Sequence, residues 1–242
     1  MSWVIVPAAG TGARFGAGLP KQYRQLAGKP LIVQTLERLL AHPGIDGALV
    51  ALAADDAHWP TLGLHFDKPL LTCIGGENRA DSVLAALHAL PASVADDALV
   101  LVHDAARPCV RHSDLDGLID AAQGDPVGAL LALPSRDTLK RGDVHARVRA
   151  TVPRELLWRA QTPQAFRRST LTNALEQARA DGALVTDEAS AMEWLELLPL
   201  LVEGHEDNIK VTVSADLALA ECILAAQRRE VQHERAHMSN QR

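Results

Sequence analysis

Short apolar runs alternate with segments of helical spacing along most of this 242-residue chain. Runs of this kind, bounded by turn residues, are typical of the strands of a parallel sheet whose connecting helices cover both faces. The alternation predicts an α/β fold with a mostly parallel, twisted sheet flanked by helices. We expect strands at Trp3–Pro7, Ala48–Ala53, Leu70–Ile74, Ala98–His103, Gly128–Leu133 and Pro199–Val202. We expect helices at Pro30–Ala41, Arg79–Leu90, Ser113–Gln123, Ser169–Asp181, Asp187–Trp194 and Ser214–Glu230.

One polar and basic segment, residues 135–166, departs from this alternation. Apolar residues recur there at roughly strand-like spacing around a Gly142-Asp143 turn signal, which predicts a projecting β-hairpin arm. An isolated hairpin is marginally stable in water. We therefore expect the arm to pack on a second copy of the chain in a homodimer, the alternative being a mobile surface insertion. The expected organisation is a single domain at 1–134 and 167–232, the arm at 135–166 and a frayed tail at 233–242.

Residues 7–23, PAAGTGARFGAGLPKQY, carry the strongest functional signal. They form a Gly-rich loop after the first predicted strand. Gly10 and Gly12 allow the backbone to approach an anion closely, while N–H groups donate to its oxygens. Arg14 offers a planar fork of donors and Lys21 a compact point charge. An ordinary surface turn is the competing interpretation, but the two cations at fixed offsets favour a triphosphate site.

Two common phosphate loops are excluded by their spacing. A dinucleotide-binding fingerprint requires G-x-G-x-x-G, whereas the third glycine here, Gly16, comes one residue late. A Walker A loop requires G-x-x-x-x-G-K-[ST], but Gly28-Lys29 is followed by Pro30 and lacks the first glycine. The remaining pattern, G-x-G-x-R-F followed by P-K-Q-Y, is similar to the signature of nucleotidyltransferases that activate sugars and polyols.

Asp104 stands where the apolar run LVLV ends, in the sequence LVLVHDAARP. In open parallel sheets ligands bind at the carboxyl ends of the strands, so Asp104 is expected to face the same crevice as the Gly-rich loop. A carboxylate in that place suits Mg²⁺, which takes its other ligands from phosphates and water. A turn-capping role is the plainer interpretation, and the company of His103, Arg107 and Pro108 favours a site.

Three shorter motifs each have a functional and a plainer interpretation. In GGENRADSV, Gly76 permits close approach to a flat ligand and Ser82 can bond a base edge, although loop-to-helix junctions are often rich in Gly and Ser. TDEAS at 186–190 fits either a binding segment or only a helix cap. DNIKVT at 207–212 is a short strand with one cation, Lys210, which is either cleft-facing or simply solvated.

Composition narrows the possible functions. A formal net charge of -6 argues against a general nucleic-acid binder. The three cysteines and ten histidines lack C-x-x-C and H-E-x-x-H spacing, so neither a disulfide framework nor a zinc site is predicted. There is no G-x-S-x-G elbow for acyl transfer. The chain enters its first strand without a signal-peptide pattern or a membrane span, which predicts a cytoplasmic protein.

Taken in order, eight motifs resemble the 2-C-methyl-D-erythritol 4-phosphate cytidylyltransferase family of the non-mevalonate isoprenoid pathway. They are PAAGTGARFGAGLPKQY, GGENRADSV, VHDAARP, RDT, TVPR, TPQAF, TDEAS and DNIKVT, and they span almost the whole chain. The resemblance implies a Rossmann-like nucleotidyltransferase domain and a homodimer held by interlocking arms. It also implies CTP and a small polyol phosphate as substrates, with Mg²⁺ or another divalent cation. The implied mechanism is attack by the acceptor phosphate on the α-phosphorus of CTP, without a covalent enzyme intermediate.

The resemblance also implies roles for single residues. Arg14 and Lys21 would stabilise the transition state, and Asp104 would bind Mg²⁺. Arg154 and Lys210 would position the acceptor phosphate. Further contacts with the acceptor are implied at Arg107, Thr138, Thr162 and Thr186. Positions that bind the nucleotide are implied at Ala8, Ala9, Gly76 and Ser82, in addition to Gly10 and Gly12 of the phosphate loop.

One residue departs from the family pattern, and two other functions stay open. The family commonly has an acidic residue before the arm arginine, where this chain has Pro153, so one charge and one amide donor that could orient Arg154 are missing. A cytidylyltransferase for another polyol phosphate, such as ribitol 5-phosphate, would use the same loop. A non-catalytic nucleotide-binding module could share the fold. The presence of Arg14, Lys21 and Asp104 together favours an enzyme.

Overall fold

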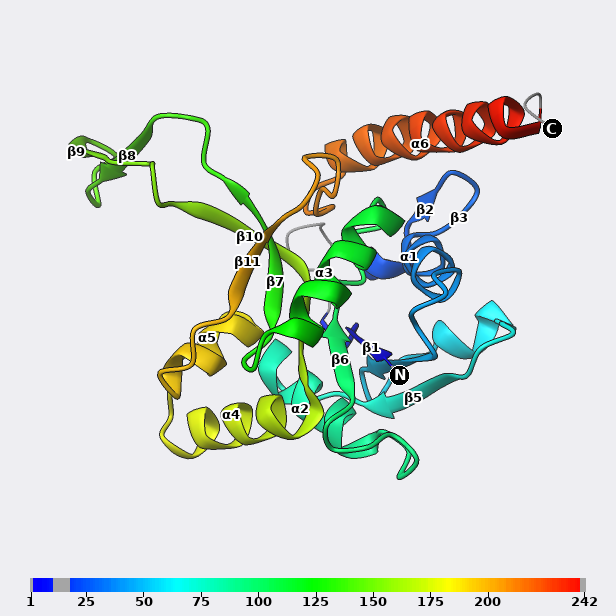
Figure 1. Cartoon of the computed structure of the whole chain (residues 1–242), viewed down its shortest axis with the longest axis horizontal. Helices are drawn as coiled ribbons and strands as arrows, with labels where there is room; N and C mark the ends of the chain where they lie inside the picture. The colour runs from blue at the N-terminus through cyan, green and yellow to red at the C-terminus, as the bar shows by residue number, and fades with distance from the viewer. Residues whose placement is uncertain (1, 11–17, 240–242) are drawn as a thin grey trace.

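The structure, a computed structural model, describes residues 2–10 and 18–239. Within these residues the centre is a seven-stranded sheet in the order β11-β7-β10-β6-β1-β4-β5 (Figure 1). All of its strands run in one direction except β10, which is antiparallel to both neighbours. The predicted mostly parallel sheet is confirmed. The strands are β1 (Ser2–Pro7), β4 (Gly47–Leu52), β5 (Leu70–Ile74), β6 (Leu99–Val102), β7 (Ala129–Pro134), β10 (Trp158–Arg167) and β11 (Leu200–Glu203).

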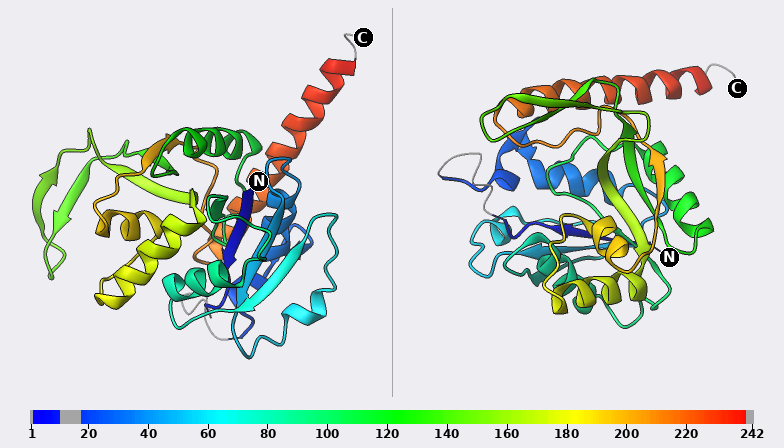
Figure 2. Two further views of the ribbon diagram at one scale, coloured as in Figure 1. Left: turned by 60° about the horizontal axis from the view of Figure 1, so that its bottom comes forward. Right: turned by 90° about the vertical axis from the view of Figure 1, so that its left-hand side faces the viewer.

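Helices cover both faces of the sheet, as Figure 2 shows. Val4 and Leu101 pack with α1 and α3 on one face, whereas Ile5 and Val100 pack with α2, α4 and α5 on the other. Because successive side chains of a strand point to opposite faces and both faces are buried, these strands are apolar throughout. The helices are α1 (Leu31–Leu40), α2 (Arg79–Ala89), α3 (His112–Gly124), α4 (Arg168–Ala180) and α5 (Glu188–Trp194).

The strand β10 corrects the predicted arm. The range 135–166 was expected to project as a whole, but β10 lies inside the sheet between β6 and β7. Its Ala165 and Phe166 are fully buried. The sequence concealed this strand because polar residues such as Arg159, Gln161 and Gln164 interrupt its apolar residues and Pro163 lies at its centre. The register shifts between Ala160 and Gln164, and the Gln164 amide is satisfied inside the protein by Asp187, at 2.8 Å.

Two segments extend from this body. The strands β8 (Leu139–Gly142) and β9 (Val148–Val152) form a separate antiparallel hairpin that projects on one side (Figure 1). The helix α6 (Ala215–Ser239) extends on the other side in that view, and it continues through the start of the tail that was predicted to fray from residue 233. Neither α6 nor any other helix in the described ranges has the length and apolar character of a membrane span.

The order of the strands fixes where a ligand can bind. The chain leaves β1 toward β4 and β5 on one side and returns to β6 on the other, so a crevice forms at the carboxyl ends of β1 and β6. The loops that follow the strands at this edge are tied to the sheet by backbone hydrogen bonds. These run from Ala8 N to Ala51 O (2.8 Å), from Gly75 N to Leu52 O (2.7 Å) and from His103 N to Ile5 O (2.9 Å).

Candidate active site

A pocket of about 230 Å³ opens between the loop that follows β1 and the loop that follows β5. The sequence motifs that predicted a nucleotide site therefore meet at one cavity. Ala8 is buried beside it and holds its loop to β4. A larger cavity, about 530 Å³, lies between α1 and α6 and contains none of the predicted site residues. The smaller pocket is lined by Pro7, Ala9, Gly10, Gly76, Glu77, Asn78, Arg79 and Ser82.

The loop that follows β5 is fixed in shape by close packing and by its own hydrogen bonds. A Cβ added at Gly75 would lie 2.7 Å from the Cβ of Ala9, so only glycine allows the two loops to approach this closely. The Ser82 hydroxyl accepts from the Gly76 N–H at 3.1 Å and donates to Asn78 O at 2.8 Å. Because a hydroxyl has one donor and two acceptor sites, Ser82 retains one lone pair for a ligand.

Beside this pocket, the carboxylate of Asp104 is surrounded by three cations. Lys210 Nζ lies 2.7 Å from Oδ2, Arg79 Nε lies 3.2 Å from Oδ1, and Arg107 Nε lies 3.6 Å from Oδ2. Asp104 itself is almost fully buried. Lys210 is therefore paired with the predicted metal ligand, and its interpretation as a simply solvated lysine is wrong.

The charge of Asp104 is set by these neighbours. Burial alone raises the pKa of the Asp104 carboxyl, but the positive charges of Arg79, Lys210 and Arg107 outweigh it and hold the pKa well below its ordinary value. The Asp104 carboxyl group is therefore ionised at neutral pH. Even with Glu188, a second carboxylate that pairs with Arg79, the cations outnumber the anions at this point, which suits a phosphate.

A buried asparagine brings two of the cations to Asp104. Asn208 is fully buried, donates from its side-chain Nδ2 to Thr162 O at 2.9 Å, and accepts at its backbone carbonyl oxygen from Arg107 Nη1 at 2.6 Å. Three residues further on, Val211 N donates to Ala106 O at 2.8 Å. The DNIKVT motif is not the short strand that was predicted, since residues 207–212 form a turn and irregular backbone. These hydrogen bonds hold the motif against the loop after β6 and fix the backbone on both sides of Lys210.

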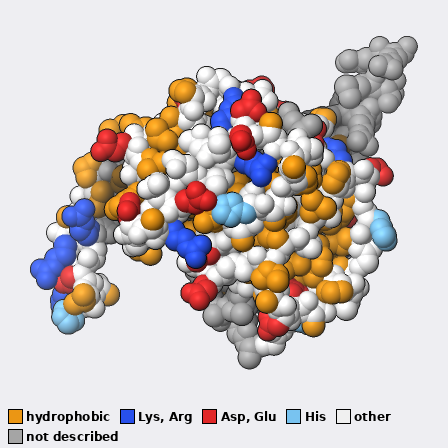
Figure 3. Space-filling view, turned by 90° about the horizontal axis from the view of Figure 1, so that it is seen from below, with side chains coloured by type: hydrophobic (Ala, Val, Ile, Leu, Met, Phe, Trp, Pro, Cys, Tyr) orange, Lys and Arg blue, Asp and Glu red, His pale blue; other side chains and the backbone are white. Residues whose placement is uncertain are grey.

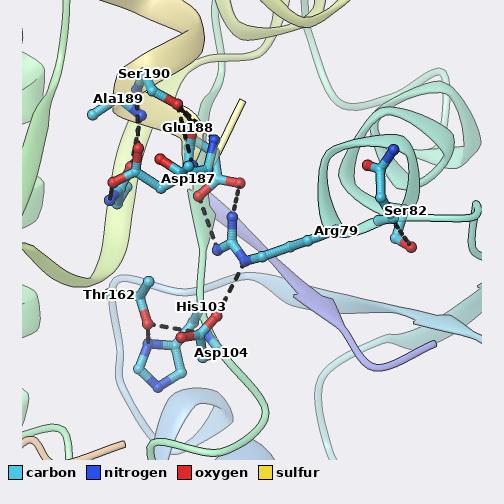
Figure 4. Close-up of polar contacts among 12 residues, drawn as sticks. Arg79, Ser82, His103, Asp104, Thr162, Asp187, Glu188, Ala189 and Ser190 are labelled. Carbon is cyan, nitrogen blue, oxygen red and sulfur yellow. Dashed lines mark hydrogen bonds and ion pairs between the residues drawn. The ribbon is translucent and has the colours of Figure 1, made fainter. Parts of the chain in front are cut away.

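The third cation, Arg79, connects Asp104 to a second buried carboxylate (Figure 4). Arg79 Nη1 and Nη2 lie 2.5 and 3.0 Å from the two carboxylate oxygens of Glu188, whose side chain is only 1% exposed. Burial lowers the pKa of Arg79, but the two carboxylates outweigh it and raise the pKa above its ordinary value. Sequence reasoning missed this pair. The available signal was a Glu in the first turn of a short helix, next to the apolar residues Ala189 and Met192.

The position of Glu188 is set by the N-terminus of α5. Asp187 is the N-cap: its side chain accepts from Ser190 N, and the Ser190 hydroxyl accepts in return from Asp187 N, which makes a capping box. The side chain of Gln164 braces the cap from β10, since it accepts from Ala189 N at 2.8 Å. The interpretation of TDEAS as a helix cap is confirmed, and Glu188 shows that the motif also supplies a residue to the site.

His103 links the loop after β6 to β10. Its Nε2 lies 2.9 Å from Arg107 O, and because a carbonyl oxygen only accepts, we assign the ring proton to Nε2. Nδ1 then accepts from the Thr162 hydroxyl at 3.2 Å, and the same oxygen accepts from Asp104 N at 3.0 Å. Burial lowers the pKa of His103 to about 4, so the ring is neutral at neutral pH. Thr162 thus holds the backbone of Asp104.

Comparison with known proteins identifies the family. The model of the 2-C-methyl-D-erythritol 4-phosphate cytidylyltransferase family matches residues 2–226. The chain belongs to this family. Cytidylyltransferases of that name from Xanthomonas oryzae pv. oryzae (strain PXO99A) and Stenotrophomonas maltophilia (strain R551-3) are 58% and 56% identical to it over 223 residues. The matches cover 92% of this chain, and 82% and 96% of the two relatives.

Solved structures of this cytidylyltransferase family share the fold. The Francisella tularensis 2-C-methyl-D-erythritol 4-phosphate cytidylyltransferase superposes with a TM-score of 0.79 at 35% identity, over 92% of this chain and 99% of that one. A 4-diphosphocytidyl-2C-methyl-D-erythritol synthase gives 0.80 at 34% identity, over 92% and 97%. The nucleotidyltransferase fold predicted from the motifs is confirmed.

Some residues that the cytidylyltransferase resemblance assigned to the site lie apart from Asp104 in the structure. Arg154 and Thr138 are exposed beside the β8–β9 hairpin, in the projecting segment between β7 and β10 (residues 135–157), where Arg154 donates to the backbone oxygen of Arg136. Thr186 is exposed just before α5. Lys21 begins a short 3₁₀ helix (Lys21–Tyr23). Backbone hydrogen bonds to the carboxylate of Asp216, at the start of α6, are the main cause of its lowered pKa, and the charge of Lys21 adds to the effect. Gly12 and Arg14 lie outside the described residues.

The buried, neutral His103 predicts a specific loss of stability in mild acid. As pH falls from 6.5 toward 4, the unfolded chain gains a proton at this ring that the folded chain does not. The free energy of unfolding should therefore fall by about 3 kcal/mol from this group. The contribution of Asp104 is lost only below its ordinary pKa of 3.8, outside this window. Urea unfolding at a series of pH values measures the slope.

The matched variants are His103→Gln and His145→Gln, the latter on the exposed hairpin turn. His103→Gln should show a shallower slope between pH 6.5 and 4 than the unaltered chain, whereas His145→Gln should reproduce its slope. Equal slopes in all three proteins would mean that His103 is not a buried neutral ring.

Proposed function

We propose that this chain transfers the cytidylyl group of CTP to 2-C-methyl-D-erythritol 4-phosphate, giving the CDP-linked methylerythritol and pyrophosphate in isoprenoid precursor biosynthesis. Membership of the cytidylyltransferase family supports this reaction. The structural observation that carries it is the group of Lys210, Arg79 and Arg107 around Asp104, next to the pocket between the two Gly-containing loops. Two phosphate-bearing substrates need fixed positive charge of this kind where they meet.

The reaction asks for alignment more than for acid–base chemistry. A bond forms between a phosphate oxygen of the acceptor and the α-phosphorus of CTP, and the bond from that phosphorus to the bridging oxygen of pyrophosphate breaks. A phosphate monoester is already an anion at neutral pH, so no side chain has to remove a proton first. Lys210 and Arg107 would orient the acceptor phosphate, and Lys21 and Arg14 would stabilise charge at the α-phosphorus.

Mg²⁺ or another divalent cation fits this site as a partner of the triphosphate. In the described ranges, no group of three or more His, Cys, Asp or Glu side chains could hold a metal by itself. Asp104 offers one buried, ionised carboxylate, and Mg²⁺ commonly takes one or two carboxylates together with phosphate oxygens and water. When bound, the ion would offset charge on the triphosphate. Lys210 is the most exposed partner of Asp104 and the one best able to exchange it for a phosphate.

A pyrophosphate-release assay tests the function. The chain is incubated with Mg²⁺, CTP and one polyol phosphate at a time, with ATP, GTP and UTP as nucleotide controls. We expect turnover with 2-C-methyl-D-erythritol 4-phosphate and CTP, at least about 10²-fold faster than with ribitol 5-phosphate or another nucleotide. Turnover with ribitol 5-phosphate alone would assign a different acceptor. If the folded protein binds CTP but releases no pyrophosphate with any acceptor, the chain is a non-catalytic nucleotide-binding module.

We further propose that the projecting segment completes the site of a second copy of the chain. Arg154 and Thr138 lie on it, away from Asp104 of their own chain. Two of its apolar side chains are almost fully exposed to water: Val144 is 94% and Leu156 89% exposed. Lys and Arg side chains gather at its end (Figure 3), and exposed basic residues there include Lys140, Arg141 and Arg147. Such a segment gains stability by packing on a partner.

Mixed dimers test the sharing of Arg154. If Arg154 serves the neighbour, a dimer of one Arg154→Ala chain and one Lys21→Ala chain contains one intact and one doubly altered site. It should recover about half of the wild-type turnover, whereas each altered homodimer is nearly inactive. Two different affinity tags isolate the heterodimer before the assay. If purified heterodimers are as inactive as the homodimers, each site uses its own Arg154.

A further inference from the structure

We propose that Glu188 is a positioning residue that holds the guanidinium of Arg79 and so keeps the adjacent Asp104 carboxylate available to the divalent cation that arrives with CTP. This inference rests on the proposed function and adds a residue pair to it. Both side chains lie outside the set predicted from the sequence. They connect three elements: the start of α2, the end of β6 and the start of α5 (Figure 4).

The geometry of Arg79 is unequal between its two carboxylates. Glu188 accepts from both terminal nitrogens of the guanidinium, at 2.5 and 3.0 Å. Asp104 accepts a hydrogen bond only from Nε of Arg79, at 3.2 Å. Paired, two-point contacts of this kind are the stronger and more directional mode for arginine and carboxylates. Glu188 therefore holds the fork of Arg79, and Asp104 receives the weaker single contact.

Removal of the Glu188 charge would change this balance. The fork of Arg79 would lose its principal partner, and the nearest remaining carboxylate is Asp104, which it already touches. Two-point pairing with Arg79 would occupy Asp104 oxygens that a divalent cation must use. The pairing of Asp104 with Lys210 differs, because Lys210 is on a flexible stem and more exposed than Arg79. Without Glu188, Arg79 would therefore compete with the ion for the oxygens of Asp104 more strongly than Lys210 does.

Arg79 also touches the nucleotide pocket, which gives Glu188 a second consequence. Arg79 is one of the residues that line the pocket of about 230 Å³, together with Gly76 and Ser82 from the same loop. A movement of the Arg79 side chain toward Asp104 would alter the wall of this pocket and the carboxylate at the same time. Nucleotide binding and ion binding are therefore coupled through one side chain whose position Glu188 sets.

The binding of Mn²⁺ in the presence of CTP, without an acceptor, tests this inference apart from turnover. Water-proton relaxation distinguishes Mn²⁺ in the protein–CTP complex from Mn²⁺ on free CTP. Glu188→Gln keeps the size of the side chain but removes its charge, and it should raise the dissociation constant of Mn²⁺ from that complex about tenfold or more. Glu193→Gln, an exposed position of the same helix, is the matched control and should leave the constant unchanged.

A double-mutant cycle shows whether Glu188 acts through Arg79. Arg79→Met retains an unbranched apolar stem without the guanidinium, so Glu188→Gln should have no further effect on Mn²⁺ binding in that background. An equal additional loss in the Arg79→Met background would refute the positioning role, as would wild-type Mn²⁺ affinity in Glu188→Gln alone. Thermal unfolding of each variant separates these outcomes from loss of the fold.

Two further results complete the design. If Glu188→Gln does not fold, Glu188→Asp replaces it: its shorter carboxylate retains the charge but loses the two-point contact, and an Mn²⁺ affinity equal to wild type would overturn the inference. If the unaltered chain binds CTP but forms no Mn²⁺ complex with it, the proposed ion site itself fails. The positioning role of Glu188 fails instead when the unaltered chain binds Mn²⁺ and the Glu188 variants do so equally well.

Discussion

The ion pairs of Asp104 are the interaction on which the site depends. They join the end of β6 to the start of α2 through Arg79, and to the segment before α6 through Lys210. Burying several charges destabilises a fold unless each charge is well paired, and replacing such clusters by apolar residues is often neutral or stabilising. The cluster is therefore better explained by what it binds than by stability. A net positive group of fixed side chains is suited to receive phosphates at the edge of the sheet.

The remaining parts of the site serve this cluster. The close approach of Gly75 to Ala9 forms a narrow pocket beside it, and Arg79 lines that pocket while its guanidinium reaches Asp104. Thr162 holds the backbone of Asp104 by accepting from its N–H. The Thr162 hydroxyl in turn donates to Nδ1 of His103, which can accept only while the imidazole is neutral. The pocket and the carboxylate are thus connected through one side chain, Arg79.

The sequence predicted the parallel strands because their apolar runs reflect burial on both faces. It predicted the place of Asp104 because the carboxyl ends of parallel strands lie at the same edge of the sheet. It could not reveal β10, since the polar residues of that strand are satisfied by distant partners such as Asp187. It also missed Glu188 and Arg79, because the two residues lie far apart in the chain and only the fold brings the starts of α2 and α5 together. Long-range ion pairs leave no local pattern.

The most direct test of the central claim is a crystal structure of the chain with CTP and Mn²⁺, in which anomalous scattering locates the ion. We expect an ion about 2 Å from a carboxylate oxygen of Asp104 and from phosphate oxygens of the nucleotide. Lys210 should have left Asp104, while Arg79 stays on Glu188. An ion held by the triphosphate alone, with Asp104 still paired with Lys210 and Arg79, would contradict the account.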